Sequence, residues 1–344
     1  MKVWNCIHGI KILWYASFLM FTITFATHHN ELNTYDKPHT KKYVIGVHRA
    51  GFFSSFLGVL NHLTLCQQIN EVPIVYWDSS SHYYLADGFN GSHNVWEYYF
   101  EPVSNLIYDP SKDTVHGSYG GQYAEFYYND FSPSTRNKAY GLISKYIRIK
   151  PQVQHKIDDF YQQNMAGKHT IGIHLRGTDK VVEERPVSPE DIIEAALAQA
   201  VETTQFFVAS DEQQLLDKAV YLLQGYKVIF YDCYRSDNGK PLHARKEKQS
   251  LAQVGEDVLV EVSLFARCDV LVHTLSNVST GALYFNPSLK SVLLYSDGGS
   301  TSVIKSSEGE LDKIKIYESS CMTNNDINSL IREKTSNNLE LYNN

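Results

Sequence analysis

Apolar and polar positions in the second half of this chain follow two alternating periods. Short apolar runs of strand length cover 169–175, 205–210, 226–231, 269–274 and 291–296. Between them lie longer segments with helical periodicity, the first beginning near Ser188 and the others covering 211–224, about 256–267 and 277–286. Ser188 is a typical N-cap, and the proline after it suits the first helical turn. Strands that alternate with helices predict a mostly parallel, doubly wound sheet.

The first half opens with the same alternation. The segment "YVIGV" is typical of a short strand, a helix with an apolar face through Phe56, Leu60 and Leu63 follows, and "VPIVYWD" is the next strand. Further on, the aromatic segment "NVWEYYFEP" predicts a short packed helix, and 137–163 predicts a helix that Pro151 interrupts. The pattern therefore indicates a βαβ opening, an irregular middle and a helical connection to the second half.

Length and pattern together predict two lobes. A chain of 344 residues exceeds the usual size of a single core. We expect an α/β protein with two Rossmann-like, doubly wound lobes and a cleft between them. The expected segments are an N-terminal signal or anchor with a linker (1–40), a first α/β lobe (41–165), a second α/β lobe (166–305) and a C-terminal helix and tail (306–344).

The N-terminus has the composition of a targeting segment. Lys2 and Lys11 flank a weakly apolar start, and 12–26 contains no charged residue. This run fits the apolar core of a secretory signal peptide, about 7–15 residues, whereas a membrane-spanning helix needs about 20. A retained signal-anchor that also uses Ile7 and Ile10 is the alternative to a cleaved signal. We expect delivery to the secretory pathway or a membrane, Golgi-like in a eukaryote, rather than a cytosolic protein with an apolar first helix.

Composition narrows the classes of partner. The formal net charge of −7 argues against a general nucleic-acid binder, so an anionic ligand must be held by local cations. The five cysteines form no C-x-x-C pair, and Cys268 lies in an apolar segment. This pattern predicts neither a disulfide framework nor a zinc site, and it makes Cys268 a small core residue.

Polar side chains gather where three strands of the second half end. Ligands of open α/β sheets bind beyond the carboxyl ends of the strands, so these positions are candidate binding residues. They are His174, Arg176, Thr178, Asp179 and Lys180 after the first strand, Ser210 and Asp211 after the second, and His273, Thr274, Ser276 and Asn277 after the fourth. We expect all three groups at one edge of the sheet.

These residue types suit a nucleoside diphosphate. Arg176 offers a two-pronged guanidinium and Lys180 a compact charge for phosphate oxygens. A helix that begins near Asn277 adds backbone N–H groups and a positive dipole end. The carboxylates that could accept hydrogen bonds from the donor edge of guanine are Glu256, Asp257 and Glu261. A charged turn and a capped helix with purely structural roles are the alternative.

Several nucleotide and hydrolase signatures are missing from the sequence. The chain contains no G-x-G-x-x-G, no G-x-x-x-x-G-K-[ST], no H-E-x-x-H and no G-x-S-x-G. These absences argue against a dinucleotide oxidoreductase, a P-loop kinase or GTPase, a zinc metalloprotease and a serine hydrolase. No D-x-D is present either, so we expect no metal cofactor and assign the cationic role to protein side chains.

Three segments resemble the peptide motifs of a known family. "GIHLRGTDK", "FFVASD" and "EVSLFARCDVLVHTLSNVS" are similar, in order and spacing, to motifs shared by GDP-fucose-dependent fucosyltransferases. The nearest branch is the α1,6-fucosyltransferases of N-glycan cores and nodulation factors, and the α1,2 and protein O-fucosyltransferases share the motifs more loosely. The resemblance covers 169–296. It implies a GT-B fold in which the second lobe binds GDP-fucose, the first faces a glycan acceptor, and fucose is transferred with inversion and without a metal.

The resemblance also implies roles for individual residues. Arg176 would bind the diphosphate, and Glu184 would be the catalytic base, with Lys180 and Asp179 beside it in the catalytic group. A carboxylate in this role takes the proton of the attacking hydroxyl as the anomeric bond breaks, and the adjacent Glu183 is the alternative base. The remaining expected donor-site residues are His174, Thr178, Ser210, Asp211, Glu261, Thr274, Ser276 and Asn277, with His243 and Arg245 over the nucleotide from the loop after the third strand.

Two positions depart from the α1,6 pattern. Gly177 stands where that branch has a second arginine, which removes one diphosphate contact, and Glu261 stands where related sequences carry aspartate. The acceptor and the linkage are therefore open, and a GT-B transferase for another nucleotide sugar or a degenerate, non-catalytic binding module are the alternatives. In the first half, His48, Arg49 and Asn61 follow the first strand as candidates for the acceptor side, with an ordinary loop as the alternative.

Overall fold

The structure is a computed structural model, and it describes residues 41–117, 119–120, 124–177, 187–237, 250–296 and 301–306. The chain divides into two units, Met1–Lys41 and Lys42–Asn344, and every helix and strand below belongs to the second. The expected targeting segment and the expected terminal helix and tail lie outside the described residues. Within the described ranges, no helix is both long and apolar enough to cross a membrane.

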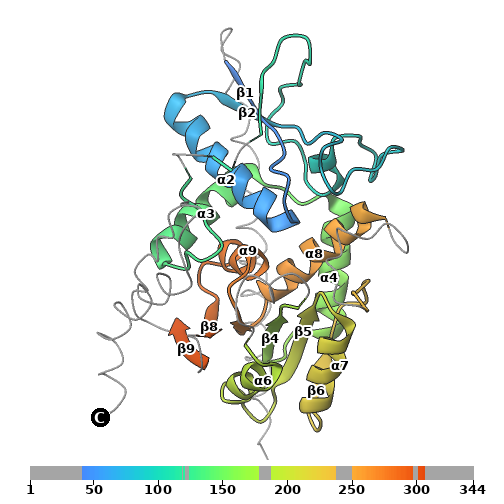
Figure 1. Ribbon diagram of the computed structural model, residues 1–344, viewed down its shortest axis with the longest axis vertical. Coiled ribbons are helices and arrows are strands. Elements are labelled where there is room, and N and C mark those ends of the chain that lie inside the picture. Colours follow the sequence, from blue (N-terminus) through green and yellow to red (C-terminus); the bar gives the residue numbers. More distant parts are fainter. Residues whose placement is uncertain are drawn as a thin grey trace, which may run out of the picture. The chain divides into compact units, whose positions relative to one another are not determined.

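A six-stranded sheet carries the second half of the chain (Figure 1). Its strand order is β6-β5-β4-β7-β8-β9, and all neighbours are parallel except β8 and β9. The chain winds outward from β4 to both edges, so the predicted doubly wound sheet is confirmed. The strands are β4 (Thr170–Leu175), β5 (Gln205–Ser210), β6 (Lys227–Ile229), β7 (Val270–His273), β8 (Lys290–Ser296) and β9 (Thr301–Ser306).

The antiparallel strand β9 is the part of this sheet that the sequence pattern did not predict. The alternation of strands and helices stops at 296, so the strand 291–296 was the last one that we predicted. The sequence carries a turn signal at Asp297-Gly298-Gly299. Because a hairpin needs no crossover helix, a strand of this kind escapes a search for strand–helix alternation.

Helices connect the parallel strands where the sequence predicts them, with one shifted start. They are α6 (Pro189–Leu197), α7 (Gln213–Leu222), α8 (Leu251–Phe265) and α9 (Asn277–Phe285). The expected cap of α6 is present, because Ser188 Oγ accepts a hydrogen bond from the backbone N–H of Asp191 at 3.1 Å. Helix α8 begins at Leu251 rather than near 256, because Ser250 caps it through the N–H of Gln253.

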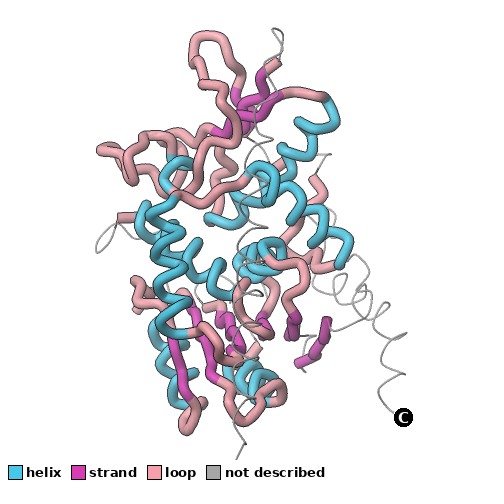
Figure 2. The backbone as a smooth tube through the Cα atoms, turned by 180° about the vertical axis from the view of Figure 1, so that it is seen from behind, coloured by secondary structure: helices cyan, strands magenta, loops and turns pink. Residues whose placement is uncertain are grey.

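The first half contains a second, smaller parallel sheet, which Figure 2 shows from behind with the large one. Its order is β2-β1-β3, and a helix joins β1 to β2, which confirms the βαβ opening. The helix break at Pro151 is confirmed as well. The elements are β1 (Lys42–Ile45), α2 (Phe52–Ile69), β2 (Val72–Val75), the 3₁₀ helix η1 (Val95–Tyr98), β3 (Val115–His116), α3 (Pro133–Tyr146) and α4 (Pro151–Asn164). A division into two lobes across a cleft stays a prediction.

Helix α9 packs against helices of the first half as well as against α8. Phe53 and Phe56 of α2 contact the ring of Phe285 at the end of α9, with ring centroids 6.4 and 5.7 Å apart. The buried Arg136 of α3 donates hydrogen bonds of 3.0 Å to the Leu289 carbonyl and to a β8 hydroxyl. These contacts place α9 in the large apolar core that both halves of the chain share.

Gly281 lies on α9 where the ring of Phe53 leaves no room for a side chain. A Cβ atom at this position would lie 2.5 Å from Phe53 Cδ1 and 2.6 Å from Cε1. Although alanine favours helices, we expect Gly281→Ala to lower the free energy of unfolding by about 1–3 kcal/mol through overpacking. Denaturant unfolding measures this shift. Gly141→Ala on α3 is the control, because nothing lies within 4 Å of its Cβ position. It should raise the free energy of unfolding by up to about 1 kcal/mol. Equal changes in the two variants would show that Phe53 does not restrict position 281.

Candidate functional site

The carboxyl ends of β4, β5 and β7 meet at one edge of the large sheet. Strand β4 is hydrogen-bonded in parallel to β5 on one side and to β7 on the other. Side chains that follow these three strands therefore lie along the same edge. We call the described members of this group the strand-end cluster: His174, Arg176, Ser210, Asp211, His273, Thr274, Ser276 and Asn277.

Asp211 organises the turn that follows β4. Its Oδ1 accepts a hydrogen bond from the Gly177 N–H at 2.8 Å, and its Oδ2 lies 3.6 Å from Nε of Arg176. The carboxylate thus holds a partly exposed cation at the sheet edge, where it can face an anionic ligand. Ser210 has a structural role in the turn after β5. Its Oγ accepts a hydrogen bond from the backbone N–H of Glu212 at 3.1 Å.

Helix α9 begins directly beyond β7 at the same edge. Ser276 is its N-cap, and the buried Oγ accepts the N–H of Val278 at 3.2 Å. Asn277 is the half-buried first residue of the helix, and the first turn carries no acidic side chain. The backbone N–H groups of a helix start and the positive end of its dipole attract anions. The described part of this edge therefore combines an arginine with a helix start, two features that suit an anionic ligand.

Both histidines at the strand ends are buried and neutral. His174 Nδ1 lies 2.9 Å from Ser279 Oγ, a contact that joins β4 to α9. His273 Nδ1 donates to the Thr274 carbonyl at 3.0 Å, since a carbonyl oxygen can only accept. Burial lowers the pKa of His174 to about 3, with smaller contributions from Arg176 and His273, and it lowers the pKa of His273 to about 4. His174 therefore contributes packing and polarity to this edge rather than charge.

Because His174 and His273 are neutral in the folded protein, we expect the protein to lose stability in mild acid. A histidine of the unfolded chain titrates near pH 6.5, so the unfolded state binds both protons before the folded state does. Their contribution to the free energy of unfolding is present above pH 6.5 and is lost as the pH falls toward 4. The melting temperature should decrease over this range, and His174→Asn should flatten the decrease. The exposed His155 of α4 is the control position, and the same pH slope for His155→Asn and His174→Asn would contradict the assignment.

The carboxylates of α8 are engaged within the protein. Glu261 lies 3.1 Å from Nη2 of Arg235 and accepts the Cys233 thiol at 3.4 Å. Burial raises the pKa of Glu261 to about 7, because desolvation outweighs the opposing effect of Arg235. The buried Glu256 forms an ion pair with Lys156 of α4. This ion pair explains how the Glu256 carboxylate is stabilised without a bound ligand. Of the α8 carboxylates that we expected near a guanine, Glu261 is the one that pairs with Arg235 and accepts the Cys233 thiol in the loop after β6.

Arg235 is a residue of this region that sequence reasoning missed. From the sequence we expected His243 and Arg245, in the loop after β6, to cover the nucleotide. Both lie outside the described residues. Arg235 is buried in the described part of that loop, donates to the carbonyls of Tyr231 and Cys233, and pairs with the Glu261 carboxylate. Its position could have identified it: Arg235 is a basic residue shortly after β6, and the carboxyl end of β6 lies at the same edge of the sheet.

Glu212 fills the space beside Gly177. A Cβ atom at Gly177 would lie 2.5 Å from Cδ and 2.8 Å from Oε2 of Glu212. An arginine at this position, as in the α1,6 pattern, would require the Glu212 side chain to move. A glycine beside an acidic side chain thus stands where the α1,6 pattern has its second arginine.

The candidates of the first half have ordinary structural surroundings. His48 is half-buried with its ring 5.2 Å from that of Tyr119, and Arg49 is exposed. Asn61 is fully buried, and its carboxamide makes four hydrogen bonds to the backbone of the segment 119–126. Asn61 therefore holds a loop in place, and the acceptor role of His48 and Arg49 stays a prediction.

The expected catalytic residues and part of the expected donor site lie outside the described residues. The catalytic candidates concerned are Asp179, Lys180 and Glu184, with Glu183 as the alternative base, and the donor-site candidates are Thr178, His243 and Arg245. Their roles stay predictions from the sequence. In the part of the chain that the structure describes, no three His, Cys, Asp or Glu side chains gather as ligands for a metal ion.

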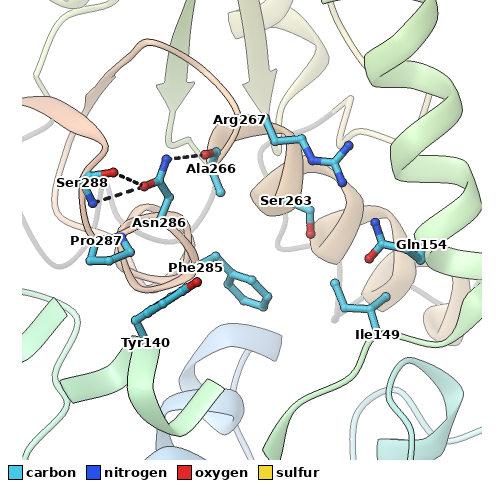
Figure 3. A pocket seen from close by; sticks show the side chains of 10 residues that line it. All are labelled: Tyr140, Ile149, Gln154, Ser263, Ala266, Arg267, Phe285, Asn286, Pro287 and Ser288. Atoms are coloured by element: carbon cyan, nitrogen blue, oxygen red, sulfur yellow. Dashed lines mark hydrogen bonds between the residues drawn. The ribbon is translucent and has the colours of Figure 1, made fainter. Parts of the chain in front are cut away.

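A separate pocket of about 560 Å³ lies at the opposite end of α9 (Figure 3). Arg267, after α8, is paired with Asp158 at 2.6 Å, and Asn286 donates to the Ala266 carbonyl at 2.8 Å. None of its lining residues belongs to the strand-end cluster, so this pocket is not the candidate donor site. The lining residues are Tyr140, Ile149, Gln154, Ser263, Ala266, Arg267, Phe285, Asn286, Pro287 and Ser288.

Comparison with solved structures finds several similar folds. NodZ α1,6-fucosyltransferase co-crystallised with GDP has a TM-score of 0.49 and 15% identity, covering 78% of this chain and 99% of that chain. POFUT1 in complex with GDP-fucose has a TM-score of 0.44 and 11% identity, covering 75% and 98%. A mutant of Arabidopsis thaliana FUT1 in complex with GDP has a TM-score of 0.43 and 15% identity, covering 76% and 71%. No family model matches the chain, and no curated protein matches it.

Proposed function

We propose that this chain is a glycosyltransferase that moves L-fucose from GDP-β-L-fucose to a hydroxyl group of a glycan or glycoconjugate, with inversion and without a metal ion. The observation that supports the proposal most directly is the strand-end cluster. It combines a partly exposed arginine held by Asp211 with the capped start of α9 at one edge of a doubly wound sheet. The three sequence motifs that resemble those of fucosyltransferases supply these same residues.

The proposed chemistry places the positive charges where negative charge develops. GDP becomes more negative as the anomeric bond breaks, and Arg176 with the N–H groups of the α9 start would stabilise it. Glu184 would take the proton of the attacking hydroxyl, and attack from the face opposite GDP inverts the anomeric centre. The charge-free stretch 12–26 supports a further part of the proposal, delivery to the secretory pathway or a membrane.

A glycan-array assay tests the proposed reaction. The full chain is incubated with GDP-fucose on the array, and a parallel panel measures nucleotide release from other GDP- and UDP-sugars. We expect fucosylated glycans and unchanged turnover in the presence of EDTA. Turnover of GDP-mannose without turnover of GDP-fucose would overturn the choice of sugar, and loss of activity with EDTA would contradict the metal-free reaction.

A nucleotide-binding module without transferase activity is the second candidate. Gly177 and Glu212 favour it, because a carboxylate occupies the place of a second diphosphate-binding arginine. Calorimetry that shows GDP binding, together with no product on any glycan of the array, would favour this candidate over the transferase.

A further inference from the structure

Two buried asparagines in the first half differ in how their carboxamides are used. Asn61 is 0% exposed, and its Nδ2 and Oδ1 together make four hydrogen bonds, to Tyr119, Glu125 and Phe126. Asn129 is 2% exposed, yet neither its Oδ1 nor its Nδ2 has a hydrogen-bond partner among the described residues. Each buried polar group without a partner costs about 1–3 kcal/mol. The carboxamide of Asn61 thus has all of its hydrogen bonds within the protein, whereas that of Asn129 has none. This difference points to a role of Asn129 other than stabilising the fold.

Asn129 lies in a turn that covers the start of α9. The turn closes at 127–130 through a backbone hydrogen bond of 3.2 Å. The Tyr128 carbonyl, immediately before Asn129, accepts the Thr280 hydroxyl at 2.7 Å. That hydroxyl also lies 2.9 Å from the carbonyl of Ser276, the N-cap of α9. One hydroxyl therefore links the turn to the strand-end cluster.

His273, at the end of β7, carries a third buried polar atom of this kind. Its Nδ1 donates to the Thr274 carbonyl, so Nε2 is the acceptor nitrogen of a neutral imidazole. Nε2 is buried and has no hydrogen-bond partner in the described ranges. The ring of Phe131, two residues after Asn129, packs edge-on against the imidazole with centroids 5.3 Å apart. The ring of Phe131 thus joins the end of β7 to the segment that carries Asn129.

The chemistry of the three atoms selects the kind of ligand. They comprise one donor, Asn129 Nδ2, and two acceptors, Asn129 Oδ1 and His273 Nε2. A phosphate dianion offers only acceptors, so it would face two acceptors unfavourably, whereas hydroxyl groups both donate and accept. The atoms are shielded from solvent in this structure, but Asn129 breaks no hydrogen bond when its side chain rotates toward a ligand. These properties suit a sugar ring better than a diphosphate.

We infer that Asn129 is a sugar-recognition residue whose carboxamide binds hydroxyl groups of the donor sugar, with His273 Nε2 as a second acceptor. The inference rests on the proposed function, because it assumes a nucleotide sugar at the strand-end cluster. It adds a specificity-determining residue from the first half of the chain to a donor site that is otherwise built from the second half.

Asn129→Leu separates recognition from folding. Leucine has a similar volume and no polar atoms, so the free variant should be as stable as the wild type or more stable. Its affinity for GDP-fucose should fall about 5–20-fold, as expected for one or two lost hydrogen bonds, whereas its affinity for GDP alone should not change. Asn61→Leu is the matched control and should lower the melting temperature, because it removes four hydrogen bonds.

Calorimetric titration of the full chain with GDP and with GDP-fucose, together with thermal unfolding, gives the result. Unchanged GDP-fucose affinity in Asn129→Leu, or equal losses for both ligands, would overturn the inference and leave the proposed function standing. If Asn129→Leu does not fold, His273→Asn takes its place, since it retains a donor near Nδ1 and removes Nε2; wild-type affinity for GDP-fucose there would overturn the inference. Wild-type protein that binds neither ligand would overturn the proposed function and the inference with it.

Discussion

Arg176→Ala should lower the affinity for GDP by about 10–100-fold. Charge-assisted hydrogen bonds contribute about 1.5–3 kcal/mol each, and Arg176 can form a two-pronged contact with phosphate. Asp211 already orients its guanidinium at the sheet edge, so little side-chain entropy is lost on binding. Because the contact is to the diphosphate, the loss should appear in the Kd of GDP itself, measured by calorimetry without any sugar or acceptor.

Arg267→Ala is the matched control for this measurement. Arg267 has 30% side-chain exposure against 26% for Arg176, and it is likewise paired with an aspartate, Asp158. It lines the pocket of Figure 3 instead of the strand ends, so its removal should leave GDP affinity unchanged. Arg176→Lys should fall between the alanine variant and the wild type, because lysine keeps the charge and loses the fork. Equal affinities in Arg176→Ala and the wild type would remove the cation from the proposed site.

Helix α9 connects the proposed site to packing far from it. Its first residue lies in the strand-end cluster, its middle residue Gly281 meets the ring of Phe53, and its last residue, Phe285, packs against α2. Residues of the first half therefore determine where the start of α9 lies. A side chain at Gly281 that shifts the helix should then weaken GDP binding as well as stability, although position 281 touches no ligand.

The order of elements in the large sheet was predictable because each strand carries a local signal. Strands β4 and β5 are apolar runs buried at every position, and the capping Ser188 marks the start of α6. Cys268, expected as a core residue, is buried. The convergence of three strand ends then followed from parallel topology alone, without knowledge of any contact.

Pairings between distant segments could not be predicted in this way. The Glu256 carboxylate meets Lys156, which lies 100 positions away in the chain, and His174 meets Ser279, which lies 105 positions away. Local periodicity says that a residue is buried or polar, but it does not say which partner satisfies it. For this reason the sequence suggested a base-binding role for Glu256, and it gave no sign that His174 is neutral and used in packing.

Glu184→Gln should reduce kcat by about 10²–10⁴-fold, the usual contribution of a positioned general base. Glutamine keeps the shape of the side chain and cannot accept the proton of the attacking hydroxyl. GDP affinity should not change, because this carboxylate would act on the acceptor and not on the diphosphate. The variant therefore differs from Arg176→Ala, in which the loss lies in Kd.

Steady-state kinetics with GDP-fucose and an acceptor found on the array would measure this effect, and Glu183→Gln is the control. Adjacent residues cannot both direct a carboxylate at one hydroxyl, so only one of the two variants should lose turnover. A collapse in Glu183→Gln alone would transfer the role of base to that residue. Full turnover in both variants would mean that the proton leaves by another route, and Asp179 would be the next carboxylate to replace, because it lies three residues after Arg176 in the motif that supplies the diphosphate contact.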